Sequence, residues 1–342
     1  MIKNDVSLAD SNQQSLHAAN PIVLVCCADN NYSMPLAVML RSVVENLKSD
    51  YQLLVFVIDR GITEQNKKRI LKPLDPAKCE VRFLSTETLD KNIRGDELSK
   101  DEMFKSEFRA LPDYITGTSL YKFIIPEILP AQVEKAIYLD CDLVVRGDLG
   151  KLWESNLADN YVLAVRELWI PYIKDGIANY KELGLPGEAK FFNSGVLVLN
   201  LKRWRADKIS TQLIDHLKRN IEYRTFWDQD TLNTILVEQW GELDPRWNVT
   251  PGVHKLLAVN SHLFSAEVRE SLLQDPLVVH YASASKPWST PKTAFYNEFQ
   301  FKDVFFQYVD LTDWAGWRLT FWRLMWAKLG RKWRSLKSAQ SK

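Results

Sequence analysis

Three short apolar runs near the start of the chain constrain its fold more than any other feature. The runs "PIVLVCCADN" (21–30), "QLLVFVID" (52–59) and "EVRFL" (80–84) lack the alternation of a strand with one solvated face. Apolar residues recur at helical spacing between Leu36 and Leu47, and a second helix is predicted to begin near Thr63. This β-α-β-α-β order predicts a parallel sheet covered by helices on both faces.

Further elements are predicted along the rest of the chain. The segment "TSLYKFIIPEIL" (118–129) predicts a buried helix that ends near Pro130. Later strands are predicted at 135–140, 161–165, 194–201 and 276–283, and helices near 207–219 and 228–239. Open α/β sheets bind ligands beyond the carboxyl ends of their strands. The polar residues predicted at such ends are Asp29, Asp59, Asp140 and His280.

Composition sets the broad class of the protein. With 342 residues, 46% of them hydrophobic, the chain can bury a large core in one big domain or two. Its formal net charge of +1 gives no reason to expect a nucleic-acid partner. Residues 1–20 are polar, and no segment holds about 18 uninterrupted apolar residues, so we expect a cytoplasmic protein. The 4 cysteines lack CxxC spacing and indicate reduced, packed thiols.

The stretch "AIYLDCDLVV" (136–145) places two carboxylates, Asp140 and Asp142, between two apolar runs. Residues i and i+2 of an extended segment point to the same side, so both carboxylates can converge on one ion. Two oxygen ligands suit Mg²⁺ or Mn²⁺, and these ions commonly bridge to substrate phosphates. Because the motif is short and common, a strand-end turn with two solvated aspartates remains an alternative.

Four sequence blocks, in this order, resemble glycosyltransferase family 8. The blocks are "YLDCDLVVRGDLGKLW" (138–153), "FFNSGVLVLNLKRW" (191–204), "WDQDTLN" (227–233) and "HYASASKPW" (280–288). The family includes bacterial lipooligosaccharide α-galactosyltransferases, lipopolysaccharide α-glucosyltransferases and glycogenin. The resemblance implies a GT-A fold, with a mixed, mostly parallel Rossmann-like sheet flanked by helices. It also implies a retaining transferase that uses a UDP-sugar with Mn²⁺, for which Mg²⁺ is the alternative ion.

The resemblance implies a metal site made by Asp140, Asp142 and His280, with the UDP diphosphate completing the shell. Carboxylate and neutral imidazole together are acceptable to Mn²⁺. Lys286 resembles the family lysine that contacts the diphosphate, where a cation stabilises the charge that develops as UDP leaves. Taken alone, His280 is also compatible with a hydrogen-bonded strand-end histidine, and Lys286 with a solvated surface charge.

The segment "ADNNY" (28–32) matches the uridine site of the family. We expect Asp29 and Asn31 to hydrogen-bond the uracil and ribose, and Tyr32 to stack on the base. A polar strand-to-helix turn is the alternative for this segment. The full nucleotide-binding set that the resemblance implies is Ala28, Asp29, Asn31, Tyr32, Asp140, Cys141, Asp142, Ser283 and Lys286.

The donor sugar is expected near Asn193, Asp228 and Gln229. Gln229 matches the position beneath the anomeric carbon, and an amide is a poor nucleophile, so front-face substitution is favoured over double displacement. In that mechanism the departing phosphate helps to deprotonate the acceptor hydroxyl, and the carbonyl oxygen of Gln229 stabilises positive charge on the sugar. Asp228 is alternatively the N-cap of the following helix. The implied donor-sugar set is Lys122, Asp140, Glu167, Asn193, Ser194, Asp228 and Gln229, and the implied catalytic set is Gln229, Asp228 and Lys286.

Two positions depart from the family pattern. Lys122 stands where the family generally has arginine, and a lysine cannot reproduce a bidentate guanidinium contact. Ser283 stands where related sequences commonly have glycine beside the diphosphate, so its side chain either narrows the phosphate site or donates to it. Glu167 is expected to contact the sugar or acceptor, or else to pair with Arg166 or another surface cation.

The sequence also suggests a division of the chain. Residues 1–20 form a polar extension, and 21–290 form the GT-A domain, with a nucleotide part at about 21–145 and a sugar and acceptor part at about 146–290. Residues 291–342 form a basic, Trp-rich helical tail. Its segment 313–342 predicts an interfacial helix on an anionic membrane surface, with a helix docked on the domain as the alternative.

The expected acceptor is a lipopolysaccharide core or another cell-surface glycan, and the expected location is the inner face of the cytoplasmic membrane. Two other functions remain open from the sequence. A haloacid dehalogenase phosphohydrolase would use Asp140 as nucleophile and Asp142 as acid/base. A non-catalytic protein would bind UDP without turnover.

Overall fold

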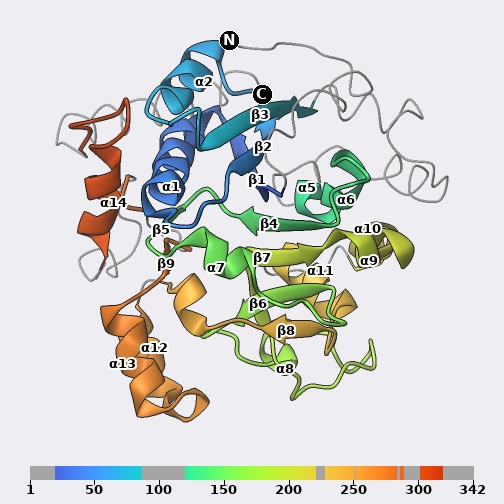
Figure 1. Cartoon of the computed structure of the whole chain (residues 1–342). Coiled ribbons are helices and arrows are strands. Elements are labelled where there is room, and N and C mark those ends of the chain that lie inside the picture. The colour runs from blue at the N-terminus through green and yellow to red at the C-terminus, as the bar shows by residue number, and fades with distance from the viewer. Residues whose placement is uncertain are drawn as a thin grey trace, which may run out of the picture.

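The chain folds around one seven-stranded sheet. The computed structural model describes residues 20–86, 120–220, 228–250, 252–282, 286–288 and 301–318. Within them the strand order is β3-β2-β1-β4-β7-β6-β8, and Figure 1 shows these strands stacked from β3 at the top to β8 at the bottom. The strands are β1 (Ile22–Asp29), β2 (Leu53–Arg60), β3 (Cys79–Ser85), β4 (Lys135–Leu139), β6 (Val162–Arg166), β7 (Phe192–Asn200) and β8 (Trp240–Glu242).

The sheet is mixed and mostly parallel, which confirms the predicted fold class. β3, β2, β1 and β4 are parallel to one another, and β8 is parallel to β6. β7 runs antiparallel to both of its neighbours, β4 and β6. Because of this reversal, the amino end of β7 lies at the same edge of the sheet as the carboxyl end of β4. The start of β7 therefore adds side chains to the edge at which the preceding parallel strands end.

Helices flank the sheet, and the sequence sets several of their limits. Thr63 caps α2 (Glu64–Leu71), because its hydroxyl accepts from the backbone N–H of Asn66 at 3.3 Å. The other helices are α1 (Ser33–Asn46), α5 (Leu120–Phe123), α6 (Ile125–Ile128), α7 (Leu149–Trp153), α8 (Ile173–Gly176), α9 (Leu201–Ala206), α10 (Ile209–Arg219), α11 (Asp228–Ile235), α12 (Val253–Val259), α13 (Ala266–Gln274) and α14 (Lys302–Val309).

The predicted single helix over 118–129 differs from the structure. In its described part the segment forms two short helices, α5 and α6, with a break at Ile124. Pro126 has no N–H to donate to the carbonyl of Lys122, and its ring clashes with the preceding turn. The proline therefore ends one helix and begins the next.

A second, two-stranded sheet brings distant parts of the chain together. The short strand β9 (Val278–His280), within the predicted strand 276–283, pairs antiparallel with β5 (Leu143–Val145). In this register His280 lies opposite Leu143, directly after Asp142. The pairing thus carries His280 to the carboxylate pair, although the two segments are far apart in sequence.

The described end of the chain packs on the domain. Phe305 and Phe306 of α14 lie in an apolar cluster with Val38 of α1. The Arg69 guanidinium of α2 lies 3.9 Å from the ring centroid of Trp314 and bonds the Asp313 carboxylate at 3.1 Å. Residues 301–318 are thus docked, and 313–318 form turns and irregular backbone instead of the predicted helix. The rest of that prediction, 319–342, lies outside the described residues.

Two further expectations concern the cysteines and membrane spans. All 4 cysteines are buried and free, which confirms the prediction of reduced, packed thiols. In the described parts of the chain, no helix combines the length and the apolar character needed to cross a bilayer.

Candidate functional site

A cavity of about 510 Å³ lies at the edge of the sheet where β1, β2 and β4 end and β7 begins. This volume falls in the usual range for small-molecule sites, roughly 300–1,000 Å³. The predicted site residues on its wall are Ala28, Asp29, Tyr32, Lys122, Asp140, Cys141, Asp142, Asn193, Ser194, Asp228, Gln229 and His280. The wall also includes Cys27, Arg60, Tyr138, Gly195 and Ala282, which the sequence did not single out.

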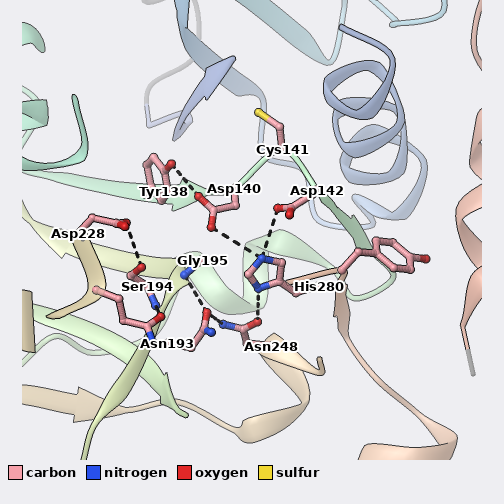
Figure 2. Close-up of polar contacts among 12 residues, drawn as sticks. Tyr138, Asp140, Cys141, Asp142, Asn193, Ser194, Gly195, Asp228, Asn248 and His280 are labelled. Carbon is pink, nitrogen blue, oxygen red and sulfur yellow. Dashed lines mark hydrogen bonds and ion pairs between the residues drawn. The ribbon is translucent and has the colours of Figure 1, made fainter. Parts of the chain in front are cut away.

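Asp140, Asp142 and His280 form one group, whose ligand atoms all lie within 4.8 Å of one another. The Nε2 of His280 is 3.7 Å from Oδ2 of Asp140 and 3.3 Å from Oδ1 of Asp142 (Figure 2). Two carboxylates and one imidazole suit Mn²⁺, while Mg²⁺ prefers oxygen ligands alone. The side chains present therefore fit the divalent ion that the sequence predicted.

Backbone and side-chain groups hold Asp140 and Asp142 as the chain leaves the sheet. The N–H of Asp140 donates to the carbonyl of Gly195 at 2.9 Å, which extends the pairing of β4 with β7 by one residue. The hydroxyl of Tyr138 donates to the Asp140 carboxylate at 2.8 Å. Burial acts to raise the pKa of Asp142, but nearby positive charge, chiefly that of the Lys286 ammonium, outweighs burial and holds that pKa well below its usual value. Asp142 is thus ionised at neutral pH, as a metal ligand must be.

Lys122 is a buried cation, only 2% exposed, between two carboxylates. Its ammonium donates to Oδ2 of Asp228 at 2.6 Å and to the carbonyl of Ser194 at 2.9 Å, and it lies 3.6 Å from Oδ1 of Asp140. Burial acts to lower the pKa of Lys122, but Asp140 and Asp228 raise it to above its usual value. Lys122 therefore stays charged, and it links Asp140 to Asp228 without the bidentate geometry of an arginine.

Ser194 connects the two residues predicted to face the donor sugar. Its hydroxyl donates to Oδ2 of Asp228 at 3.2 Å, and its backbone N–H donates to Oε1 of Gln229 at 3.0 Å. Both partners come from the first turn of α11, which lies beside the start of β7. The wall on this side of the cavity is therefore held together by hydrogen bonds between β7 and α11.

The turn after β1 forms the polar turn considered for it and also borders the cavity. The Asp29 carboxylate caps a 3₁₀ turn, accepting from the backbone N–H groups of Asn31 at 2.9 Å and Tyr32 at 3.0 Å. The side-chain amide of Asn31 donates to the same carboxylate at 3.2 Å. This is the polar turn of the alternative interpretation, and Asp29 and Tyr32 also face the cavity.

Among the described residues, the cavity wall does not include Asn31, Glu167 or Lys286. Asn31 is exposed beside the cavity. Lys286 contacts the Asp142 carboxylate and donates to the carbonyl of Tyr281 at 2.7 Å. Glu167 is buried one residue behind the wall, with its carboxylate bonded to the Asn193 amide. Ser283 lies outside the described residues.

Sequence reasoning missed three residues that shape the site. Arg60, opposite Asp29 in the register of β1 and β2, lines the cavity, and its place after a strand end was the available signal. Asn248 hydrogen-bonds Nδ1 of His280 at 2.9 Å. A Cβ on Gly195 would lie 2.2 Å from Cε1 of His280, so only glycine leaves room for the imidazole. No local pattern marks Asn248 or Gly195, because their partner is distant in sequence.

Known proteins resemble the chain over most of its length. Residues 23–291 match the family model described as glycosyl transferase family 8. General stress protein A of Bacillus subtilis (strain 168) is 28% identical over 294 residues, which cover 85% of this chain and 94% of that protein. Glycosyltransferase GlyE of Streptococcus pneumoniae serotype 4 is 29% identical over 226 residues, which cover 65% of this chain and 49% of GlyE. The chain thus spans about half the length of GlyE.

Solved structures share the fold. The galactosyltransferase LgtC, in complex with donor and acceptor sugar analogues, aligns with a TM-score of 0.66 at 23% identity, over 88% of this chain and 99% of LgtC. The apo structure of the bifunctional glycosyltransferase WbbM aligns with a TM-score of 0.67 at 19% identity, over 87% of this chain and 51% of WbbM. These likenesses confirm the GT-A fold, and the family match shows that the haloacid dehalogenase alternative is wrong. The chain belongs to glycosyltransferase family 8.

Proposed function

We propose that this glycosyltransferase moves a hexose, glucose or galactose, from a UDP-sugar to a saccharide acceptor with retention at the anomeric carbon. The observation that carries the proposal is the cavity itself. It unites the group of Asp140, Asp142 and His280 with the polar wall made by Asn193 and Asp228. Such a cavity offers a charged site for a diphosphate beside a hydrogen-bonding surface for a sugar.

The nucleotide side of the proposal rests on the residues around the end of β1. Asp29 and Tyr32 line this part of the cavity, and Arg60 adds a positive charge from the end of β2. A Mn²⁺ or Mg²⁺ ion would be held by Asp140, Asp142 and His280, and it would neutralise charge on the departing UDP. Lys286, which contacts Asp142, places an ammonium next to the same group and would stabilise the same charge.

Contacts on the sugar side support front-face substitution. Asp228 is a carboxylate on this wall, and its Oδ2 already accepts from the Lys122 ammonium and the Ser194 hydroxyl. These donors lower its nucleophilicity, which disfavours a covalent glycosyl-enzyme. Gln229 keeps its carbonyl oxygen on the backbone N–H of Ser194 and carries no charge. The acceptor hydroxyl would then lose its proton to the departing phosphate.

The acceptor and location are proposed from the sequence. Family resemblance favours a lipopolysaccharide core or another surface glycan, assembled at the inner face of the cytoplasmic membrane. The abundance of Trp, Lys and Arg in 313–342 supports peripheral binding to anionic lipid. Because Trp314 packs under Arg69 on the domain, this binding would depend on the residues that follow 318.

The test is UDP release from a panel of UDP-sugars, with Mn²⁺ and with chelator, using water or a saccharide extract as acceptor. We expect release from one donor, dependent on the ion and abolished in Asp142→Asn. Glu242→Gln, which removes an equal charge from β8 on the surface, should retain full activity. No release from any donor, together with ion-dependent UDP binding, would favour the non-catalytic alternative.

A further inference from the structure

A chain of hydrogen bonds leads from Glu167 to the candidate metal site. Glu167, directly after β6, accepts from Nδ2 of Asn193 at 2.6 Å. Oδ1 of Asn193 accepts from Nδ2 of Asn248 at 2.8 Å, and Asn248 in turn contacts Nδ1 of His280 at 2.9 Å. The four residues are 3–6% exposed, and hydrogen bonds between buried groups are electrostatically stronger than in water. Figure 2 shows the part of the chain from Asn193 to His280.

Contacts at Glu167 and Gly195 fix the direction of these hydrogen bonds. A carboxylate only accepts, and Oε1 of Glu167 is already bonded to the backbone N–H groups of Leu168 at 2.8 Å and Trp169 at 3.1 Å. Oε2 must therefore receive the NH₂ group of Asn193. The backbone N–H of Gly195 donates to Oδ1 of Asn193 at 2.9 Å, which favours the same orientation of that amide.

The direction then passes to the histidine. Because Asn193 presents its oxygen, Asn248 must present its NH₂ group to Asn193 and its own oxygen to His280. An oxygen at 2.9 Å from Nδ1 requires that Nδ1 carry a proton. In the neutral imidazole the lone pair is then on Nε2, the nitrogen that faces Asp140 and Asp142.

We propose that Glu167 is a positioning residue which, through Asn193 and Asn248, holds the proton of neutral His280 on Nδ1 and so leaves Nε2 free to bind the metal ion. The proposal deepens the proposed function, since it rests on the metal site assigned there. Gly195 completes the arrangement, because its missing side chain leaves the space that the imidazole occupies. Glu167 thus acts on the site without touching the metal ion or the sugar.

The first experiment observes the tautomer directly. Selective ¹⁵N-histidine labelling gives signals from only 5 histidines, and the His280 signal is assigned by its loss in His280→Gln. NMR spectra of the metal-free protein, at a pH where imidazoles are neutral, distinguish a protonated from an unprotonated ring nitrogen. We expect a protonated Nδ1 and an unprotonated Nε2. A neutral His280 with its proton on Nε2 would overturn the proposal.

The second experiment uses Glu167→Gln to reverse the direction of the hydrogen bonds between residue 167 and His280. The glutamine oxygen is needed by Leu168 and Trp169, so its NH₂ group must face Asn193. Turning over Asn193 and Asn248 relieves the contact between two NH₂ groups, at the cost of the acceptor of the Gly195 backbone N–H. Asn248 then donates to Nδ1, and the proton moves to Nε2, beside the Asp142 carboxylate. We expect the tautomer to switch and the affinity for Mn²⁺, measured by electron paramagnetic resonance of free Mn²⁺, to fall about 10–100-fold. Glu242→Gln is the charge-matched control and should change neither quantity.

A second change should restore the tautomer. Adding Asn248→Asp to Glu167→Gln places an acceptor-only carboxylate against Nδ1, while the turned Asn193 donates to its other oxygen. We expect the double variant to return the proton to Nδ1 and to regain most of the affinity for Mn²⁺. A purely structural role of Glu167 predicts no such recovery. A double variant whose affinity for Mn²⁺ is as low as that of Glu167→Gln would therefore contradict the positioning role of Glu167.

The outcomes separate the inference from the proposed function. If NMR shows the predicted tautomers but UDP release does not depend on the ion, the proposed function is contradicted and the positioning role of Glu167 stands. If Glu167→Gln leaves the tautomer unchanged while UDP release is normal, the positioning role of Glu167 is contradicted and the proposed function stands. If Glu167→Gln does not fold, Asn248→Leu removes the acceptor instead, and it should give a mixture of both tautomers. A single Nδ1-protonated form in Asn248→Leu would overturn the proposal.

Discussion

Gly195→Ala should dislodge His280 from the metal site. A Cβ at this position would lie 2.2 Å from Cε1 and 2.7 Å from Nδ1 of His280, and 3.0 Å from Oδ2 of Asp140. Nonbonded carbon atoms settle about 3.5–4.0 Å apart, so the imidazole has to move by about 1.3–1.8 Å. The ring cannot keep its bond to Asn248 through such a movement.

The consequence for metal binding follows from the tolerance of coordination distances. These distances hold to within about 0.2 Å, so a displacement of more than 1 Å removes His280 from the ligand set. We expect the affinity for Mn²⁺ to fall by about 100-fold or more, since losing a ligand costs no less than losing its hydrogen-bonding partner. Overpacking should also lower the free energy of unfolding by about 1–3 kcal/mol.

Electron paramagnetic resonance of free Mn²⁺ measures the first effect, and urea unfolding measures the second. Gly241→Ala is the matched control, because its Cβ would lie 2.5 Å from Cδ2 of Leu163 in β6, away from the cavity. This variant should lose comparable stability and keep its affinity for Mn²⁺. Equal Mn²⁺ affinities in the two variants would refute the argument that Gly195 makes room for a ligand.

Three further predictions concern other parts of the molecule. Lys122→Met leaves Asp228 without its buried cation, so urea unfolding should show a loss of about 3 kcal/mol, whereas a loss below 1 kcal/mol would contradict a charged Lys122. Burial raises the pKa of Cys79 to about 12, so this thiol should stay protonated and unreactive towards a disulfide reagent until the protein unfolds. Its contribution to stability is complete below about pH 9 and declines towards pH 12, and the decline should be absent in Cys79→Ala. Arg69→Ala removes the guanidinium contacts to Asp313 and Trp314 and leaves the Lys72 ion pair to Asp313, so hydrogen exchange in 310–318 should accelerate. Unchanged exchange would mean that the Arg69 contacts are not needed to hold the segment.

Local sequence pattern was sufficient where an element buries a continuous apolar run. The runs that became β1, β2 and β3 were recognised because buried parallel strands carry no alternation. Sequence pattern failed for 118–129, because one continuous buried helix and two short helices separated by Pro126 would have the same apolar composition. β5 and β8 have only 3 residues each, too few for any periodicity.

Some residues of the candidate site could be predicted from the sequence, and others could not. Asp140 and Asp142 could be paired from their spacing, because neighbours two apart on an extended segment share a side. Family resemblance added His280, and the pairing of β5 with β9 explains how it arrives. Arg60 reaches the cavity only because β2 pairs with β1 in this register. No pattern of residue types encodes such a register by itself.

By itself, then, the sequence determined the first three strands, the carboxylate pair and the membership of a glycosyltransferase family, since these depend on residues near one another in the chain or on recognisable blocks. Only the tertiary structure decided what surrounds His280. Glu167, Asn193 and Asn248 come from separate elements and meet in the interior, where each polar group must find a partner. The direction of their hydrogen bonds is a property of the folded arrangement, because it depends on which donors and acceptors packing brings within 3 Å.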